Sequence, residues 1–350
     1  MPMQSRSESR AKKKKRLRWW HWVLYSVLGV AVIALCFTAW YVYSGFQQLD
    51  DMSKPSDESR FSQFTEDPEV APPEWTGTER VNILLMGGDD RGLKEGEVAR
   101  SDSMMVASFD PVTKDAHLFS VLRDTYAPIP GHGSSRINAA ITMGGPELAM
   151  KTIGNMTGLD IQYYVYVDFQ GFIKLVDAIG GVDFYVEKDM NYSSKADKNQ
   201  YDIHLEKGQQ HLDGEKALMY VRFRHDAMSD FTRTERQRAF LKAVADKLQS
   251  GWNIVRLPDI LSKVTPYIET NLQPNDMLKL ASLGFKSHQA GSAQLPPMNL
   301  LKDMKVGGDS VLGITNEEKL KDYVQEVLGK DETETPSSSA SASPSAADSE

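Results

Sequence analysis

Runs of apolar residues separated by short polar turns predict several β-strands between residues 80 and 330. Val81–Met86 is a continuous apolar run that leads into two glycines, as is typical of a buried strand. Two further runs, Ser103–Phe109 and Ala116–Leu122, are joined by a short turn and predict a pair of strands. The same reasoning predicts strands at Tyr163–Val167 and Val182–Val186.

A different spacing, with apolar residues three and four positions apart, predicts helices in the same region. The predicted helices are Pro146–Met156, Phe169–Ile179, Asp213–Tyr220 and Thr232–Leu248, followed by two with weaker patterns at 274–284 and 315–328. Because strands and helices alternate along the chain, we expect a layered α/β fold.

The longest apolar run of the chain covers residues 19–43 and contains no Asp, Glu, Lys or Arg. A helix needs about 20 apolar residues to cross a bilayer. Aromatic residues stand at both ends of the run, as expected at membrane interfaces. A cleaved signal peptide is the less favoured alternative, because its apolar part has only about 7–15 residues and because no clear A-x-A site follows the run. We therefore predict one transmembrane signal-anchor helix.

Charge is distributed unevenly on the two sides of this apolar run. Residues 1–18 carry eight basic residues and one acidic residue, a net charge of +7. The whole chain carries -8, so the remainder carries -15. The positive-inside rule then predicts a single-pass protein of the cell membrane, with a cytoplasmic N-terminus and an extracellular C-terminal domain. The acidic remainder argues against general binding of nucleic acid, which needs a basic surface.

Composition divides the chain into five predicted parts. They are a basic cytoplasmic segment at 1–18, the transmembrane helix at 19–43, a polar, proline-containing juxtamembrane stalk at 44–79, a folded domain at 80–330 and a Ser/Ala-rich acidic tail at 331–350. The tail is expected to be disordered, because it has too little apolar surface to bury. Cys36, the one cysteine, lies inside the apolar run, which excludes an intrachain disulfide and a cysteine metal site.

Acidic residues and arginines gather at the ends of the first three strands of the predicted domain. For any single charge, a solvated loop is the better interpretation, but all of them together favour a shared site. Whether these ends meet depends on the directions of the strands. The residues are Asp89, Asp90 and Arg91 after the first strand, Arg100 and Asp102 before the second, and Arg123 and Asp124 after the third.

A second concentration of arginine lies in residues 222–238, which contain five arginines and three acids. Arg222 and Arg224 would share one face of an extended segment, but they would point in roughly opposite directions on a helix. Farther along, helical spacing of i, i+3 and i+4 gives one common face to Arg233, Arg236 and Gln237. The alternative to a binding site is a solvated helix face with paired charges.

These residue types favour one kind of ligand. The planar fork of arginine matches phosphate oxygens, and carboxylates are ligands of divalent cations. Together they point to a metal-bound phosphate or diphosphate. Several other enzyme classes lack support, because the sequence contains no H-E-x-x-H, no G-x-x-x-x-G-K-[ST] and no G-x-S-x-G motif.

At these residues the chain resembles the LytR-CpsA-Psr family. The resemblance covers most of residues 81–248, and its stretches follow the order of that family. The matching stretches are Asn82–Asp90, Arg100–Met105, Ser120–Pro130, Arg136–Ala140, Gly144–Lys151, Tyr163–Gly181, Lys207–Glu215 and Ala217–Gln237.

The resemblance implies a three-layer α-β-α domain with a central mixed sheet and an apolar groove for a polyprenyl chain. It also implies a Mg²⁺-dependent phosphotransferase that moves a glycopolymer, such as teichoic acid or capsule, from undecaprenyl diphosphate to peptidoglycan. The expected partners are therefore the lipid-linked glycopolymer, peptidoglycan and the lipid bilayer, with no nucleic acid.

Individual roles follow from the same resemblance. It assigns Asp90 and Asp102 to Mg²⁺ and Arg123 to the diphosphate, and these three residues form the expected catalytic group. One of the two aspartates is the candidate general base. The other phosphate-binding candidates are Arg222, Arg224, Arg233, Gln237, Arg100 and Lys151, and Asp89 is a further site candidate.

Two other functions stay open. The protein could be a membrane-anchored envelope regulator, or transcriptional attenuator, without catalysis, in which case the basic segment would contact a cytoplasmic partner. It could also be a polyprenyl-diphosphate hydrolase that uses water as the acceptor. Residue types do not distinguish hydrolysis from transfer.

Overall fold

The structure is a computed structural model, and it describes residues 40–41, 43–53, 58–64, 68–91, 93–94, 97–193, 202–224 and 230–329. The predicted basic segment, most of the predicted transmembrane helix and the predicted acidic tail lie outside these residues. Among the helices of the described residues, none combines the length and the apolar character that crossing a membrane requires.

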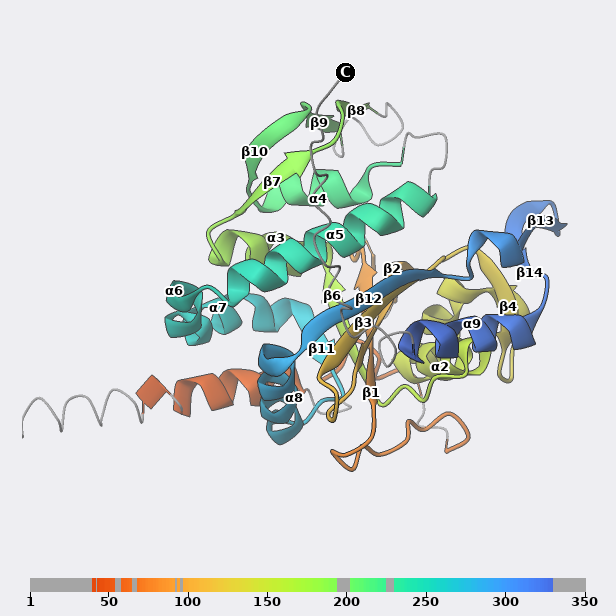
Figure 1. Ribbon diagram of the computed structural model, residues 1–350, viewed down its shortest axis with the longest axis horizontal. Coiled ribbons are helices and arrows are strands. Elements are labelled where there is room, and N and C mark those ends of the chain that lie inside the picture. The colour runs from red at the N-terminus through yellow and green to blue at the C-terminus, as the bar shows by residue number, and fades with distance from the viewer. Residues whose placement is uncertain are drawn as a thin grey trace, which may run out of the picture.

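A six-stranded mixed sheet forms the centre of the molecule (Figure 1). Its strand order is β11-β6-β1-β2-β3-β12. The three middle strands β1, β2 and β3 are antiparallel to one another, whereas β6 runs parallel to β1 and β12 parallel to β3. This sheet confirms the predicted α/β class. Its strands are β1 (Val81–Gly88), β2 (Ser101–Phe109), β3 (Asp115–Val121), β6 (Tyr163–Asp168), β11 (Ile268–Thr270) and β12 (His288–Leu295).

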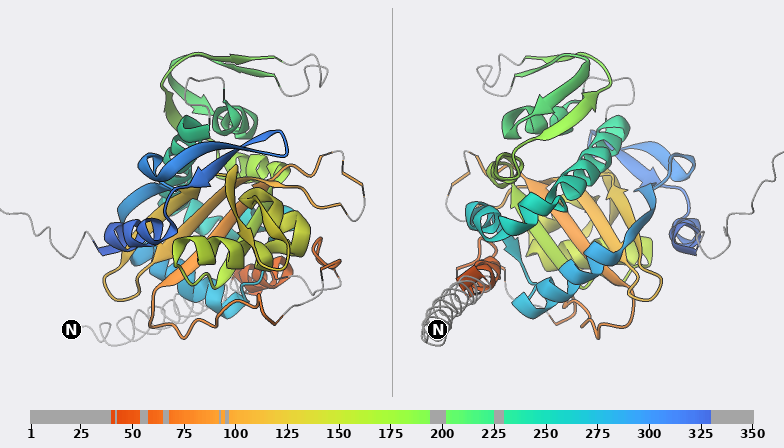
Figure 2. Two further views of the ribbon diagram at one scale, coloured as in Figure 1. Left: turned by 90° about the vertical axis from the view of Figure 1, so that its right-hand side faces the viewer. Right: turned by 60° about the vertical axis from the view of Figure 1, so that its left-hand side comes forward.

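Helices cover both faces of this sheet. On one face, α2 (Ala140–Thr157) and α9 (Glu317–Gly329) pack against a core that includes Leu84 and Val106. On the other face lie α3 (Phe169–Ala178), α4 (Gly214–Arg222) and α5 (Asp230–Leu248). The right view of Figure 2 shows α5 crossing in front of the sheet. Because both faces are covered, β1 is apolar along most of its length, which explains its continuous apolar run.

Smaller elements surround the central sheet. A second sheet has the order β13-β14-β4-β5, and β10-β7 and β8-β9 form two-stranded sheets. These strands are β4 (Thr125–Ile129), β5 (Gly133–Arg136), β7 (Val182–Val186), β8 (Met190–Tyr192), β9 (Ile203–Leu205), β10 (Gly208–Leu212), β13 (Leu301–Val306) and β14 (Asp309–Ile314). The remaining helices are α6 (Gly251–Val255), α7 (Leu257–Val264) and α8 (Pro274–Lys286), with short 3-10 helices at Ile137–Ala139, Thr265–Tyr267 and Met298–Leu300.

A break inside α2 explains why the helical pattern begins at Pro146. The backbone of Gly144 and Gly145 is not helical, so the second half of α2 starts at the proline. Gly145 has a φ of 76°, in the left-handed region that favours glycine. A Cβ atom at this position would lie 3.0 Å from the ring of Phe64, which belongs to the segment before the domain.

Candidate functional site

The antiparallel register brings the ends of β1, β2 and β3 to one edge of the sheet. Gly88, at the end of β1, lies opposite Ser101, at the start of β2. Met104 of β2 lies opposite Val121, the last residue of β3. The charged residues that adjoin these three strand ends are therefore neighbours in space.

Asp102 lies in a β-bulge of β2. Gly87 pairs with Ser103 and Gly88 pairs with Ser101, so Asp102 is the extra residue between them. Bulges redirect side chains and are frequent beside active sites. The Asp102 Oδ1 atom accepts a hydrogen bond from Arg123 Nη1 at 2.5 Å, and Arg224 Nη2 lies 3.6 Å from the same oxygen.

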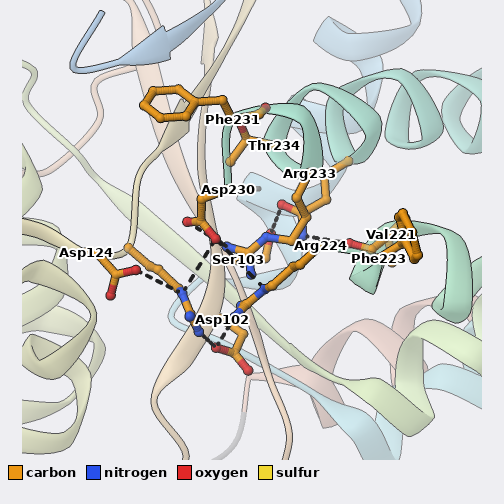
Figure 3. Close-up of polar contacts among 12 residues, drawn as sticks. Asp102, Ser103, Asp124, Val221, Phe223, Arg224, Asp230, Phe231, Arg233 and Thr234 are labelled. Carbon is orange, nitrogen blue, oxygen red and sulfur yellow. Dashed lines mark hydrogen bonds and ion pairs between the residues drawn. The ribbon is translucent and has the colours of Figure 1, made fainter. Parts of the chain in front are cut away.

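Asp230, the first residue of α5, forms ion pairs with three arginines, two of which, Arg224 and Arg233, are labelled in Figure 3. Its Oδ1 atom lies 2.9 Å from Arg233 Nη2, 3.8 Å from Arg224 Nε and 3.9 Å from Arg123 Nε. Burial raises the pKa of Asp230, and the charges of Arg224 and Arg123 oppose this shift. Sequence reasoning did not assign Asp230 to the site, although its position at the start of the arginine-bearing helix was a usable signal.

The arginines of this cluster share the carboxylate of Asp230, and Arg123 and Arg224 are partly buried. Burial lowers the pKa of Arg224, and the nearby positive charge of Arg123 lowers it further. Arg233 is only 2% exposed. Salt screens repulsion between partly buried like charges less than repulsion between exposed ones, so a phosphate-bearing ligand placed among these arginines would relieve the repulsion between Arg123 and Arg224.

Asp90 lies in a separate set of contacts at the same edge of the sheet. Its Oδ1 atom accepts a hydrogen bond from the Tyr166 hydroxyl at 2.6 Å, and its Oδ2 atom pairs with Arg60. Arg60 Nε also lies 2.8 Å from the buried carboxylate of Glu269. Burial alone would lower the pKa of Arg60, but the hydrogen bond and charge of Glu269 together with the charge of Asp90 raise it.

An apolar pocket of about 510 Å³ lies between the sheet and helices α3, α4 and α5. Its volume is within the range of small-molecule sites. Along α5 its lining changes from polar to apolar, first Arg233 and Gln237, then Phe240, Leu241 and Val244. The sheet and the other helices supply further apolar walls, among them Leu85, Met105, Val165, Phe172 and Leu218.

Seven residues give the pocket its polar lining, and five of them were predicted site residues. The structure thus brings Asp102, Arg222, Arg224, Arg233 and Gln237 to one pocket, with Ser103 and Asp168 beside them. Burial raises the pKa of Asp168, whose carboxylate also caps α3 through the Gly171 amide. The register placed Asp168 opposite Gly88, a relation that the sequence pattern did not reveal.

The backbone changes conformation between Arg222 and Arg224, whose relative orientation could not be predicted from the sequence. Arg222 ends α4, and Phe223 is extended, so the segment is neither one helix nor one strand. Both Arg222 and Arg224 nevertheless line the pocket. The Arg222 guanidinium also lies 5.2 Å from the centre of the Phe169 ring.

Other predicted residues have different surroundings. Arg100 is exposed and is not among the residues that line the pocket. Lys151 is exposed on α2, which packs on the opposite face of the sheet from the pocket. Asp89 pairs with Arg91 at 2.6 Å. Burial would raise the pKa of Asp89, but the hydrogen bonds and charge of Arg91 lower it.

Asp90 and Asp102 have the chemistry of ligands for a shared cation. Mg²⁺ is usually held by one or two carboxylates together with phosphate oxygens and waters. The two aspartates adjoin neighbouring strand ends, and both arginines near Asp102 approach the same oxygen, Oδ1. They therefore fit a cation that is held jointly with a diphosphate. Within the described part of the chain, no group of three or more His, Cys, Asp or Glu residues could hold a metal ion.

Comparison with known proteins places the chain in a family. The model of the LytR_cpsA_psr family matches residues 39–323. The chain belongs to the LytR-CpsA-Psr family. The matched residues include the pocket, its arginines and Arg60.

Relatives in the LytR-CpsA-Psr family carry two kinds of names. Regulatory protein MsrR of Staphylococcus aureus strain COL is 35% identical over 255 residues, which cover 71% of this chain and 75% of MsrR. The polyisoprenyl-teichoic acid–peptidoglycan teichoic acid transferase TagU of Bacillus mycoides strain KBAB4 is 33% identical over 270 residues, covering 76% of this chain and 83% of TagU.

The fold also matches solved structures of the family. One of them is the LytR-CPS2A-psr family protein YwtF (TagT) with bound octaprenyl pyrophosphate lipid. It is 27% identical, with a TM-score of 0.56, and the match covers 74% of this chain and 95% of that protein.

Proposed function

We propose that the protein is a phosphotransferase that moves a glycopolymer from undecaprenyl diphosphate to peptidoglycan. The observation that carries this proposal is the pocket itself, apolar along its length and lined by arginines at one end. The name of TagU describes such a transfer, and TagT has been solved with a polyprenyl pyrophosphate. The glycopolymer that this chain moves would be teichoic acid or a capsule-like polymer.

The two ends of the pocket have different roles in this proposal. The apolar end buries part of the polyprenyl chain, and each buried CH₂ group contributes roughly 0.8 kcal/mol. The polar end holds the diphosphate through Arg222, Arg224 and Arg233. Since tail and diphosphate are held together, the phosphorus to be attacked lies beside Asp102.

The reaction needs positioning and charge stabilisation more than covalent help from the protein. A sugar hydroxyl of peptidoglycan attacks the glycopolymer-bearing phosphorus, and the bond from this phosphorus to the bridging oxygen breaks. Polyprenyl phosphate leaves with the bond's electrons. Arg123 and Arg224 stabilise the growing negative charge, and Asp102, which lines the pocket, accepts the proton of the hydroxyl. Mg²⁺, held by Asp90 and Asp102 when bound, would supply further neutralisation of the diphosphate.

The proposed location of the folded domain is the outer side of the cell membrane. Residues 19–43 would anchor it in the cell membrane, with the N-terminus in the cytoplasm and the folded domain outside. Donor lipid and enzyme would then share one membrane, which raises their effective concentration.

Replacing Arg123 tests the proposed reaction. Arg123→Ala should reduce transfer to peptidoglycan at least a hundredfold with the fold retained, because it removes charge stabilisation that is realised in the transition state. The assay follows the product formed from a lipid-diphosphate donor by the full-length protein. Arg80→Ala is the matched control, since Arg80 also pairs with an aspartate at the sheet and its side chain has nearly equal exposure (23% against 22%). Undiminished transfer by Arg123→Ala would contradict the proposal, and release of the polymer without an acceptor would favour the hydrolase alternative.

A non-catalytic regulator is the second candidate, and the name of MsrR favours it. Such a regulator would use the basic segment to contact a cytoplasmic partner. Deleting residues 1–11 while keeping Lys12–Arg18 should leave transfer unchanged if the protein is an enzyme. Loss of an envelope response together with unchanged wall attachment would favour the regulator.

A further inference from the structure

Arg60 connects the segment before the domain to the proposed cation site. Its Nε atom lies 2.8 Å from Glu269 Oε1, and its Nη1 atom pairs with Asp90. Glu269 is only 2% exposed and lies on β11, at the edge of the central sheet. The Ser59 hydroxyl donates a further hydrogen bond to Glu269 Oε2 at 2.8 Å. One guanidinium thus bridges a buried structural carboxylate and a predicted ligand of the cation.

Packing of the neighbouring residues fixes the position of Arg60. Phe61 is 6% exposed, and its ring meets the rings of Tyr164 and Tyr166 edge to face, with centroids 6.2 Å and 5.4 Å apart. The Arg60 guanidinium itself lies 4.8 Å from the centre of the Tyr166 ring. Segment 58–64 is therefore docked on the domain through Phe61, which holds Arg60 beside Asp90.

Tyr166 and Arg60 together engage both carboxylate oxygens of Asp90. Tyr166 donates to Oδ1 at 2.6 Å, while Arg60 pairs with Oδ2. A free divalent cation that binds Asp90 must replace Arg60 or share the carboxylate with it, and two positive charges at such short range repel each other. A divalent cation bound to the doubly esterified diphosphate of the donor forms a complex with no net charge, so Arg60 repels this complex far less than it repels the free cation.

We propose that Arg60 is a positioning residue that weakens binding of a free divalent cation to Asp90, so that the cation enters together with the diphosphate. This inference rests on the proposed function, because it takes Asp90 as a cation ligand. Arg60 would make binding of the two components interdependent, and each would raise the affinity of the site for the other.

Binding of Mn²⁺ without diphosphate tests this role. The full-length protein in lipid nanodiscs is titrated with Mn²⁺, and the free ion is measured by electron paramagnetic resonance. Arg60→Gln should bind Mn²⁺ at least tenfold more tightly than the unmodified protein, whereas a purely structural role predicts equal or weaker binding. Arg80→Gln is the matched control and should leave the affinity unchanged, since Arg80 pairs with Asp110 and has similar exposure (23% against 21%).

A double variant covers the case in which Arg60→Gln leaves Glu269 unpaired and fails to fold. Arg60→Gln combined with Glu269→Gln removes both charges, and it too should bind Mn²⁺ more tightly than the unmodified protein. Adding Asp90→Asn to either variant should abolish the gain. Affinity that stays equal or falls in folded variants overturns the inference, as does an absence of Mn²⁺ binding in every protein. Failure of the proposed function would instead appear as absence of transfer from a lipid donor, which this titration does not measure.

Discussion

Two arginines on one helix show how partners decide a residue's role. Arg233 and Arg236 were both expected on one face of α5, and both are buried in the structure. Arg233 lines the pocket, but Arg236 pairs with Glu187 at 2.6 Å and donates to the Phe223 carbonyl at 3.0 Å. Arg236 thus fixes the backbone at Phe223, between Arg222 and Arg224, and does not line the pocket.

Glu187 should stabilise the fold only when it is charged. Burial would raise its pKa, but hydrogen bonds from Arg236 and Tyr220 lower it below its ordinary value of 4.5. A carboxylate whose pKa is lower in the folded state than in the unfolded state stabilises the fold at pH values above its unfolded-state pKa. This contribution is lost as the pH falls through the folded-state pKa. Glu187→Gln should therefore have a lower melting temperature than the unmodified protein at pH 7, and the difference should shrink below about pH 4.5.

Thermal unfolding followed by circular dichroism between pH 3 and pH 7 (roughly the range over which a carboxylate titrates) measures this difference. Glu206→Gln, at an exposed position, is the control and should shift the melting temperature little at any pH. A difference that stays constant down to the lowest pH would contradict the role assigned to Glu187.

At the scale of elements, the end of β1 is built from two glycines with different neighbours. A Cβ atom at Gly88 would collide with the Tyr166 hydroxyl and would lie 2.8 Å from its Cζ atom. A Cβ atom at Gly87 would meet only the Cβ atom of Ser103 at 3.4 Å, an ordinary contact. Gly88 therefore allows the tyrosine to reach Asp90 across the strand end.

Gly88→Ala should displace Tyr166 and so disturb Asp90. Overpacking of this kind typically costs about 1–3 kcal/mol of stability. We expect a loss of this size in the free energy of unfolding, measured by denaturant titration, together with slower transfer. Gly87→Ala, the adjacent control, should be destabilised less. Equal stability of the two variants would argue against the close approach of Tyr166.

Elements with strong apolar patterns were predictable, and those with weak patterns were not. β1, β2, β3 and β6 appear where apolar runs predicted strands, with ends shifted by one or two residues. β12, with the sequence His288–Leu295, was missed because most of its residues are polar or small. A strand at the edge of a sheet does not need apolar residues along its whole length, so its pattern is weak.

The same limit applied to the site. Charged residues at strand ends were visible in the sequence, but their convergence depended on the antiparallel register of β1, β2 and β3. Arg60 was missed because it lies in a polar segment assigned to a stalk. Two aromatic residues there, Phe61 and Phe64, were a usable signal, since both pack against the domain core.

At the scale of the whole molecule, the pocket lies between two layers of the fold. Its walls come from the sheet on one side and from α3, α4 and α5 on the other. The charged residues that line it are Arg222, Arg224, Arg233, Asp102 and Asp168, and the rest of its lining is mostly apolar. The pocket is therefore suited to a ligand with one charged end and a long apolar chain.

Affinity for isoprenoid diphosphates should rise with tail length and then level off. Each five-carbon unit that enters the pocket should improve binding at least tenfold, because each buried CH₂ contributes roughly 0.8 kcal/mol. The rise should stop when the volume of about 510 Å³ is filled. Calorimetric titration with a series that starts at geranyl diphosphate measures this dependence, and an affinity independent of tail length would contradict the assigned role of the pocket.

Because segment 58–64 docks on the sheet, little chain separates the folded domain from the proposed membrane anchor. Residues 43–52 are helical, and at 1.5 Å per residue they extend only about 15 Å. If the proposed membrane anchor ends near Tyr43, a helix of this length would keep the catalytic domain close to the bilayer. Encounters with the carrier lipid would then depend on lateral diffusion in two dimensions, and the reach toward peptidoglycan strands would be limited to those closest to the membrane.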